Sequence, residues 1–174
     1  DEVVKFIDKA VKFLNELKEA YAKDKATTEE ILRPYLNLRL VKLDFSQEFN
    51  NLNWYVNHYA ALVYMVIDKL EEALEHARLA CELAKKLGSV YYEVLSCSLL
   101  QRIRAVKDGT LLVEEFEEIW QKALQSLFVH GVETVASKLG EYIIALAFVA
   151  RFNDVEEVLK EWSCVLEESP TTAA

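Results

Sequence analysis

Histidine, asparagine and acidic side chains are the residues of this chain whose types and spacing bear most directly on chemistry. Glu72 and His76 lie four residues apart, which places them on one helix face at a spacing compatible with two ligands of one metal ion. No second carboxylate–histidine pair accompanies them, so a simple pair on the helix surface is the favoured interpretation. The sequence contains no glycine-rich phosphate loop and no short motif of a serine hydrolase or zinc protease. We therefore expect no catalytic residues, no metal site and no cofactor, and expect that the protein is not an enzyme.

A stripe of asparagine and aromatic residues is the strongest candidate for binding chemistry. Residues 50, 53, 54, 57, 58 and 61 share one face of a segment predicted to be helical. Asparagine amides can hydrogen-bond an extended peptide, and a tryptophan can anchor a partner. The alternative is an ordinary solvated face, with the tryptophan packed on the preceding segment. On the first interpretation, the residues that contact the partner are Asn53, Trp54, Tyr55, Asn57, His58 and, from a later segment, Arg102.

Arg102 also belongs to a cluster of cations with Arg104 and Lys107 at the predicted end of a helix. Cations in the last turn complement the negative end of the helix dipole, which is the simpler explanation of the cluster. Contact with an anion or an acidic peptide is the alternative.

The elements that position these residues repeat along the chain. Four acidic doublets, separated by 42, 43 and 42 residues, each open a helix-like stretch and are each followed by an apolar residue. Self-similarity at such a period is typical of a repeat array, in which one supersecondary unit stacks on its copies. Acidic residues favour the first turn of a helix, so the doublets indicate repetition and not metal or catalytic carboxylates. They are Glu29-Glu30, Glu71-Glu72, Glu114-Glu115 and Glu156-Glu157.

Hydrophobic periodicity and a scarcity of glycine and proline predict an all-α fold. The chain has only four Gly and two Pro, too few for the turns of a β-rich protein. Eight helices fit the pattern, of which the second opens at Thr27 and is interrupted by Pro34. The third is expected to bury Phe49, Leu52, Val56, Tyr59, Val63 and Val66. The other predicted helices cover about 2–23, 46–67, 70–87, 89–107, 112–128 (closed by Gly131), 133–151 and the stretch from the Asn153-Asp154 turn to 167.

The stretch from Tyr64 to Gly88 resembles the second half of a tetratricopeptide repeat. Small residues at Ala73, Ala77 and Ala80 stand where that family places them to allow close helix approach, and Leu139-Gly140 is similar to the Leu-Gly pair of a repeat's first helix. The period exceeds the usual one of about 34 residues, so the resemblance is to a long-period variant. Phe116 and Trp120 also replace the expected alanines, and HEAT-like or other α-solenoids of similar period remain alternatives.

This resemblance implies a right-handed superhelical solenoid of about four antiparallel helical hairpins. The hairpins would cover about 1–44, 45–88, 89–131 and 132–168 of a single domain, followed by a tail at 169–174. It further implies a scaffold or adaptor that binds a protein or peptide in a concave groove lined by the first helix of each hairpin. The alternatives are a small-molecule-sensing regulatory domain, which would need a closed pocket lined by aromatic residues, and an accessory subunit of a nucleic-acid-handling complex.

Charge and cysteine usage narrow the classes of partner and location. A net charge of -9 argues against direct binding to nucleic acid or to an anionic membrane and is compatible with a basic partner. The longest apolar run, 142–150, is too short to span a bilayer, and no secretory leader is visible. Cys81, Cys97 and Cys164 are dispersed in apolar contexts and are expected to be reduced core thiols, with a buried disulfide as the alternative. From the expected reduced thiols and the lack of a visible leader we expect a cytoplasmic location.

One further stripe falls in the predicted seventh helix. Besides the face that packs on neighbouring hairpins, this helix carries apolar residues on a second side, although a terminal hairpin should be polar there. The tail, a neighbouring segment, the partner or a second copy of the chain must then cover it. We expect an intermolecular contact, either with a partner or in a homodimer, through Ile144, Phe148 and Phe152, with Ala145 in the same stripe.

Overall fold

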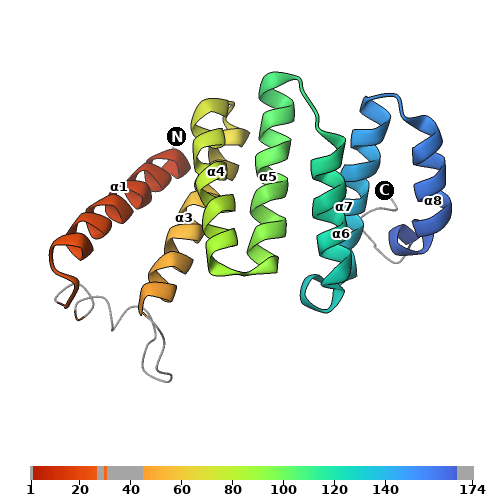
Figure 1. Cartoon of the computed structure of the whole chain (residues 1–174). Helices are drawn as coiled ribbons and strands as arrows, with labels where there is room; N and C mark the ends of the chain where they lie inside the picture. The colour runs from red at the N-terminus through yellow and green to blue at the C-terminus, as the bar shows by residue number, and fades with distance from the viewer. Residues whose placement is uncertain (1, 27–29, 31–44, 168–174) are drawn as a thin grey trace. The chain divides into compact units, whose positions relative to one another are not determined.

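The structure, a computed structural model, describes residues 2–26, 30 and 45–167, and this part of the chain is all α-helical. Seven helices occupy it and no strand does, which confirms the all-α part of the predicted fold class (Figure 1). The helix predicted from Thr27 lies outside the described residues except for Glu30. No helix of the described part is both long and apolar enough to cross a membrane. The helices are α1 (Glu2–Lys23), α3 (Phe45–Val66), α4 (Leu70–Leu87), α5 (Val90–Asp108), α6 (Val113–Gln125), α7 (Leu127–Phe148) and α8 (Phe152–Glu167).

Local sequence signals account for the limits of α5 and for the end of α4. Ser89 caps α5, because its hydroxyl accepts a hydrogen bond from the backbone N–H of Tyr92 at 3.3 Å. Gly109 ends the same helix with a φ of 63°, a left-handed conformation that costs glycine nothing. Gly88 follows α4 with the same φ. At these positions the observed helix ends agree with the predicted ones to within a residue or two.

The chain divides into two compact units, Asp1–Leu87 and Gly88–Ala174. In the first unit, α3 and α4 form an antiparallel hairpin, and α1 packs on α3 (Figure 1). Leu17 is buried there among Tyr21, Phe49 and Leu52, with the rings of Tyr21 and Phe49 stacked at 5.5 Å. The hairpin itself closes over small side chains, which let two helix backbones approach. Fully buried alanines line both of its helices, namely Ala60, Ala61, Ala73, Ala77, Ala80 and Ala84.

The prediction of which face of α3 is buried is wrong for Tyr59 and Val66. Tyr59 is 54% exposed and Val66 is 79% exposed, whereas Trp54 is buried on the other side of the helix. Large apolar residues lie on both sides of α3, so hydrophobic periodicity does not select one of them. Packing does, because only the face with Ala60 and Ala61 is flat enough to meet the alanine seam of α4.

In the second unit, α5 packs on α6, α6 packs on α7, and α7 packs on α8. Phe116 and Trp120 of α6 are buried, as is Leu139 of α7, and the Trp120 ring meets Trp162 of α8 edge-to-face at 5.1 Å. Helix α8 has no buried residue and is therefore the least covered element of this unit. Gly131 does not end the sixth helix as predicted. α6 stops at Gln125, and Gly131 forms a kink inside α7 with φ 74° and ψ 162°.

The cysteines do not form the predicted set of three reduced core thiols. Cys81 and Cys97 are buried and disulfide-bonded, which corresponds to the alternative interpretation. Cys164 is a free thiol on the surface and not in the core. The cysteines therefore no longer support an intracellular location.

Candidate functional site

Helix α3 presents an aromatic stripe to solvent. Tyr55, Tyr59, Leu62 and Val66 follow one another at intervals of four, three and four residues, which puts them on one helix face. Tyr55 is 43% and Tyr59 is 54% exposed, and Leu62 is partly buried. The two tyrosine rings are stacked, with centroids 6.4 Å apart and planes only 4° from parallel. We call these four residues the tyrosine stripe.

The predicted polar face of α3 is turned the other way and is largely buried. Trp54 is 2% exposed, and its ring stacks on His58 at 5.0 Å, with His58 itself 8% exposed. Asn53 and Asn57 are 8% and 3% exposed. Of the residues predicted in α3 to contact a partner, only Tyr55 therefore offers a large exposed side chain.

Asn53, Asn57 and His76 form a hydrogen-bonded chain within the α3–α4 hairpin. The Asn57 side-chain Nδ2 donates to the backbone carbonyl of Asn53 at 2.8 Å and to Asn53 Oδ1 at 2.9 Å. The carbonyl can only accept, so the orientation of the Asn57 amide is fixed and its Oδ1 must accept from His76 Nδ1, 2.9 Å away. Burial, and to a smaller degree the nearby Lys18 charge, lower the pKa of His76, against the opposing effect of Glu72 and Glu75. The imidazole thus serves as a donor to Asn57.

His76, whose spacing from Glu72 is compatible with a metal pair, contacts Asn57 and Tyr64 in the structure. Its Nδ1 is used by Asn57, and its ring stacks on Tyr64 at 5.5 Å. Among the described residues, no group of three or more His, Cys, Asp and Glu side chains is placed to share a metal ion.

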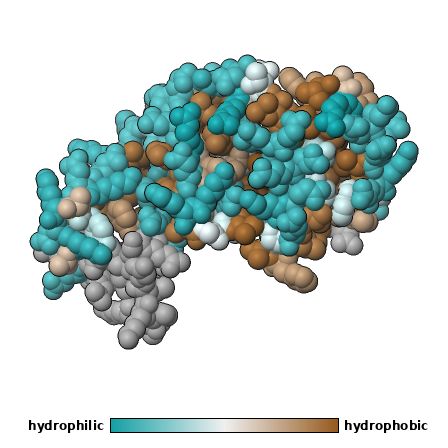
Figure 2. Space-filling view, in the orientation of Figure 1, coloured by the Kyte–Doolittle hydropathy of each residue, from teal (hydrophilic) through white to brown (hydrophobic). Residues whose placement is uncertain are grey.

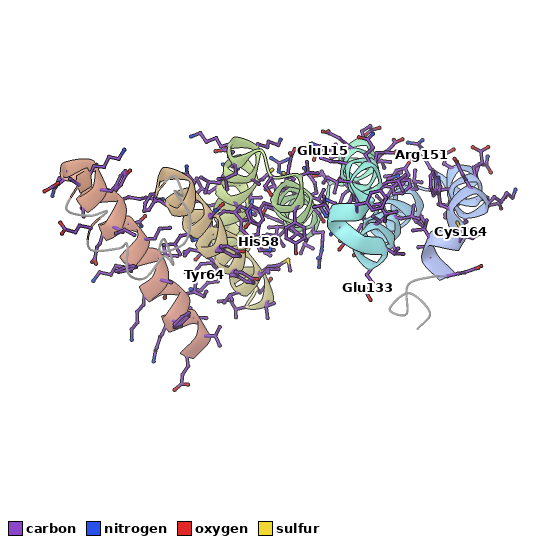
Figure 3. All side chains as sticks on the ribbon, turned by 90° about the horizontal axis from the view of Figure 1, so that it is seen from below. His58, Tyr64, Glu115, Glu133, Arg151 and Cys164 are labelled. Carbon is purple, nitrogen blue, oxygen red and sulfur yellow. The ribbon has the colours of Figure 1, made fainter. Side chains whose placement is uncertain are left out.

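Tyr64 ties α3 to α1. Its hydroxyl donates a hydrogen bond to the Asp8 carboxylate, and Figure 3 shows Tyr64 on α3. This hydrogen bond, together with burial and the Asp8 charge, raises the pKa of Tyr64 to about 12. Tyr64 is therefore a structural link between two helices of this unit.

Arg102 belongs to the second unit, where it joins a charged network. Its guanidinium lies 3.9 Å from the Glu141 carboxylate and is half exposed. Glu141 also accepts a hydrogen bond from the buried Lys138 ammonium at 2.9 Å and one from the Ser98 hydroxyl at 2.6 Å. Lys138 donates in addition to Ser98 at 2.7 Å. The helix dipole is therefore not the whole explanation of the position of Arg102, because Arg102 also has a carboxylate partner in Glu141.

The apolar residues predicted to make an intermolecular contact lie at the surface. Ile144, Phe148 and Phe152 are 65%, 68% and 62% exposed, while Ala145 of the same stripe is buried. On the face shown in Figure 2, hydrophobic residues reach the surface in several places, mainly over the second unit. No part of the chain described here covers these three side chains, so contact with a partner or a second copy stays a prediction.

Two residues that could take part in binding could not be identified as such from the sequence: Tyr59, which is exposed and stacked on Tyr55, and Lys18, which lines a pocket. Tyr59 was assigned to the core, although its spacing of four residues from Tyr55 could have indicated a ring stack on one exposed face. Lys18 carries no signal in the sequence, because its surroundings come from α3 and α4.

Comparisons with known proteins add no further information about this chain. Scans of protein-family models and searches of curated proteins and of solved structures find no match. The resemblance to tetratricopeptide repeats therefore rests on the sequence pattern alone.

Proposed function

We propose that the protein is a non-catalytic scaffold that binds a protein or peptide, and that the tyrosine stripe of α3 is part of its contact surface. The carrying observation is the exposed, stacked pair Tyr55 and Tyr59, followed by the exposed Val66. Monomeric proteins rarely expose large contiguous apolar patches, and such patches mark interaction sites. Tyrosine is enriched among the residues that dominate binding energy, since it buries a large ring at a low entropic cost.

The stacked geometry also favours this function on energetic grounds. A ring held against its neighbour has fewer accessible rotamers in the free protein, so less conformational entropy is lost when a partner covers it. A small-molecule sensor would instead need aromatic side chains that converge on a closed pocket, whereas these two tyrosines face solvent. The net charge of -9 makes a basic partner the better electrostatic match.

We also propose that the helices continue as a right-handed solenoid of the tetratricopeptide type, with the α3–α4 hairpin as one repeat. Support comes from the 42–43-residue spacing of the acidic doublets and from the buried alanines of α4 at the positions that the resemblance assigns to small residues. In such an array, the first helices of successive hairpins share one surface, which would extend the stripe into a longer binding face.

Affinity capture tests the proposed binding function. Tagged wild-type protein is compared in native lysate with the Tyr55→Ser/Tyr59→Ser variant and with Phe6→Ser/Phe13→Ser, a matched control that removes two exposed rings from α1. We expect a specific protein to be retained by wild type and by the control, and to be lost from the tyrosine variant. One hot-spot residue corresponds to a loss of affinity of roughly 30-fold, so the double variant should lose at least that much. Equal retention by all three well-folded proteins would contradict the assignment of the stripe.

A further inference from the structure

A pocket in the first unit lies on the side of α3 opposite the tyrosine stripe. It encloses about 360 Å³, and its lining comes from α1, α3 and α4. Asn53 and Asn57 are the buried polar residues of the lining, while Glu82 and Lys86 are exposed. The full lining is Lys18, Asn53, Asn57, Leu79, Glu82, Leu83 and Lys86.

Two cations line this pocket, and neither is ion-paired within the part of the chain that the structure describes. Within the described residues, neither Lys18 nor Lys86 forms an ion pair or a hydrogen bond. Lys18 is half-buried, and burial lowers its pKa with no carboxylate to offset the effect. Even with Glu82 counted, the lining carries one net positive charge in a chain of net charge -9. Such a site attracts anions in spite of the overall charge of the chain.

The hydrogen-bonded chain from His76 leaves a donor at the pocket. Asn57 uses its Nδ2 toward Asn53, so the Oδ1 of Asn53 is occupied as an acceptor. The Nδ2 of Asn53 therefore remains, and no acceptor for it exists among the described residues. Because the Asn53 backbone carbonyl fixes the orientation of Asn57, the direction of the whole chain is set: His76 donates to Asn57, Asn57 donates to Asn53, and the amide of Asn53 is free to donate.

We propose that this pocket binds an oxyanion, either a carboxylate or a phosphate group, between the ammonium of Lys18 and the side-chain amide of Asn53. An unpaired ammonium and an unpaired amide N–H supply donors only, and an oxyanion is the ligand that supplies acceptors only. Anion binding also restores to Lys18 the electrostatic partner that its partial burial lacks. The site is independent of the tyrosine stripe, because residues 53 and 57 face the opposite side of α3 from residues 55 and 59.

An NMR titration of the intact chain tests this site. Sodium phosphate and sodium acetate are each added at pH 7 and constant ionic strength, and the side-chain amide signals of Asn53 are followed. We expect a saturable shift in wild type and about tenfold weaker binding in Lys18→Gln, the loss expected for one hydrogen bond to a charged group. Lys85→Gln makes the same charge change on exposed α4 surface outside the pocket and should stay within about twofold of wild type.

Asn53→Asp provides the second, sterically matched test. It keeps the oxygen that accepts from Asn57 but replaces the free donor by a carboxylate oxygen, so it should abolish saturable anion binding, read from the neighbouring backbone amides.

Saturation with both salts supports a carboxylate or phosphate ligand, and saturation with phosphate alone supports a phosphate group. No saturable shift with either salt overturns the proposal, as does an equal loss in Lys18→Gln and Lys85→Gln, which would indicate general ionic attraction.

Discussion

Replacement of Lys138 by methionine is expected to destabilise the protein substantially, even though lysine is usually a surface residue. The Lys138 side chain is only 9% exposed, and its ammonium lies 2.7 Å from the Ser98 hydroxyl and 2.9 Å from the Glu141 carboxylate. Methionine keeps most of the unbranched apolar stem, so the change removes the charge and its hydrogen bonds with little loss of packing.

The magnitude follows from the two hydrogen bonds that are lost. Each hydrogen bond to a charged group contributes about 1.5–3 kcal/mol, and breaking a buried ion pair costs about 3–5 kcal/mol. Glu141 is not left without partners, because the Ser98 hydroxyl still donates to it and Arg102 lies 3.9 Å away. We therefore expect the lower end, a loss of about 3 kcal/mol in the free energy of unfolding.

Urea unfolding followed by circular dichroism measures this loss. Lys160→Met removes an exposed lysine of α8 and should change the free energy of unfolding by less than about 0.5 kcal/mol. The double variant Lys138→Met/Glu141→Leu removes both charges and should recover part of the loss, because the Glu141 carboxylate is no longer buried without its ammonium partner. A cost below about 1 kcal/mol for Lys138→Met, at an unchanged m-value, would refute the view that the network is structural.

Three further predictions test other parts of the structure. Both ring nitrogens of His130 are buried and have no hydrogen-bond partner among the described residues, and burial, followed by the Lys138 charge, lowers the pKa of His130. The unfolded state therefore binds more protons, so the free energy of unfolding should fall as pH decreases below about 6.5, and His130→Phe should flatten this dependence in pH-dependent urea unfolding. The pKa of Tyr64, raised to about 12 mainly by its hydrogen bond to Asp8, predicts stability that is full below about pH 10 and is lost as pH rises through about 12. Burial also raises the pKa of Tyr142, so absorbance titration should show late-titrating tyrosines, and the Tyr64 contribution should be missing in Tyr64→Phe. If the exposed Phe148 mediates self-association, light scattering should show a mass that rises with concentration in wild type but not in well-folded Phe148→Ser, and a wild type that stays monomeric would contradict this.

Helix positions could be predicted from the sequence because local signals specify them. Ser89 and Gly109 act through their own side chain or backbone conformation, so the limits of α5 follow without knowledge of the rest of the chain. Gly131 shows where this fails. It was expected to end a helix, and it does interrupt one, but the chain resumes helical geometry at once and α7 continues to Phe148.

The buried side of α3 and its polar contacts could not be predicted, because they depend on other helices. Aromatic and apolar residues occur on both sides of α3, and the alanine seam of α4 decides which side is covered. Asn57 looked like a residue for a partner, yet its amide is used by Asn53 and by His76, which lies 19 residues away. Lys138 is buried only because Ser98 and Glu141 satisfy its ammonium, and no pattern in one segment indicates that.

The central claim is that a partner covers the exposed tyrosines of α3, and hydroxyl-radical footprinting of the complex tests it most directly. Tyr55 and Tyr59 are accessible to oxidation in the free protein, as are Phe6 and Phe13 on α1. With the captured partner bound, we expect oxidation of both tyrosines to fall severalfold while that of the two phenylalanines is unchanged. Tyrosine oxidation that is the same in the free and the bound protein, under conditions where binding is saturated, would contradict the account.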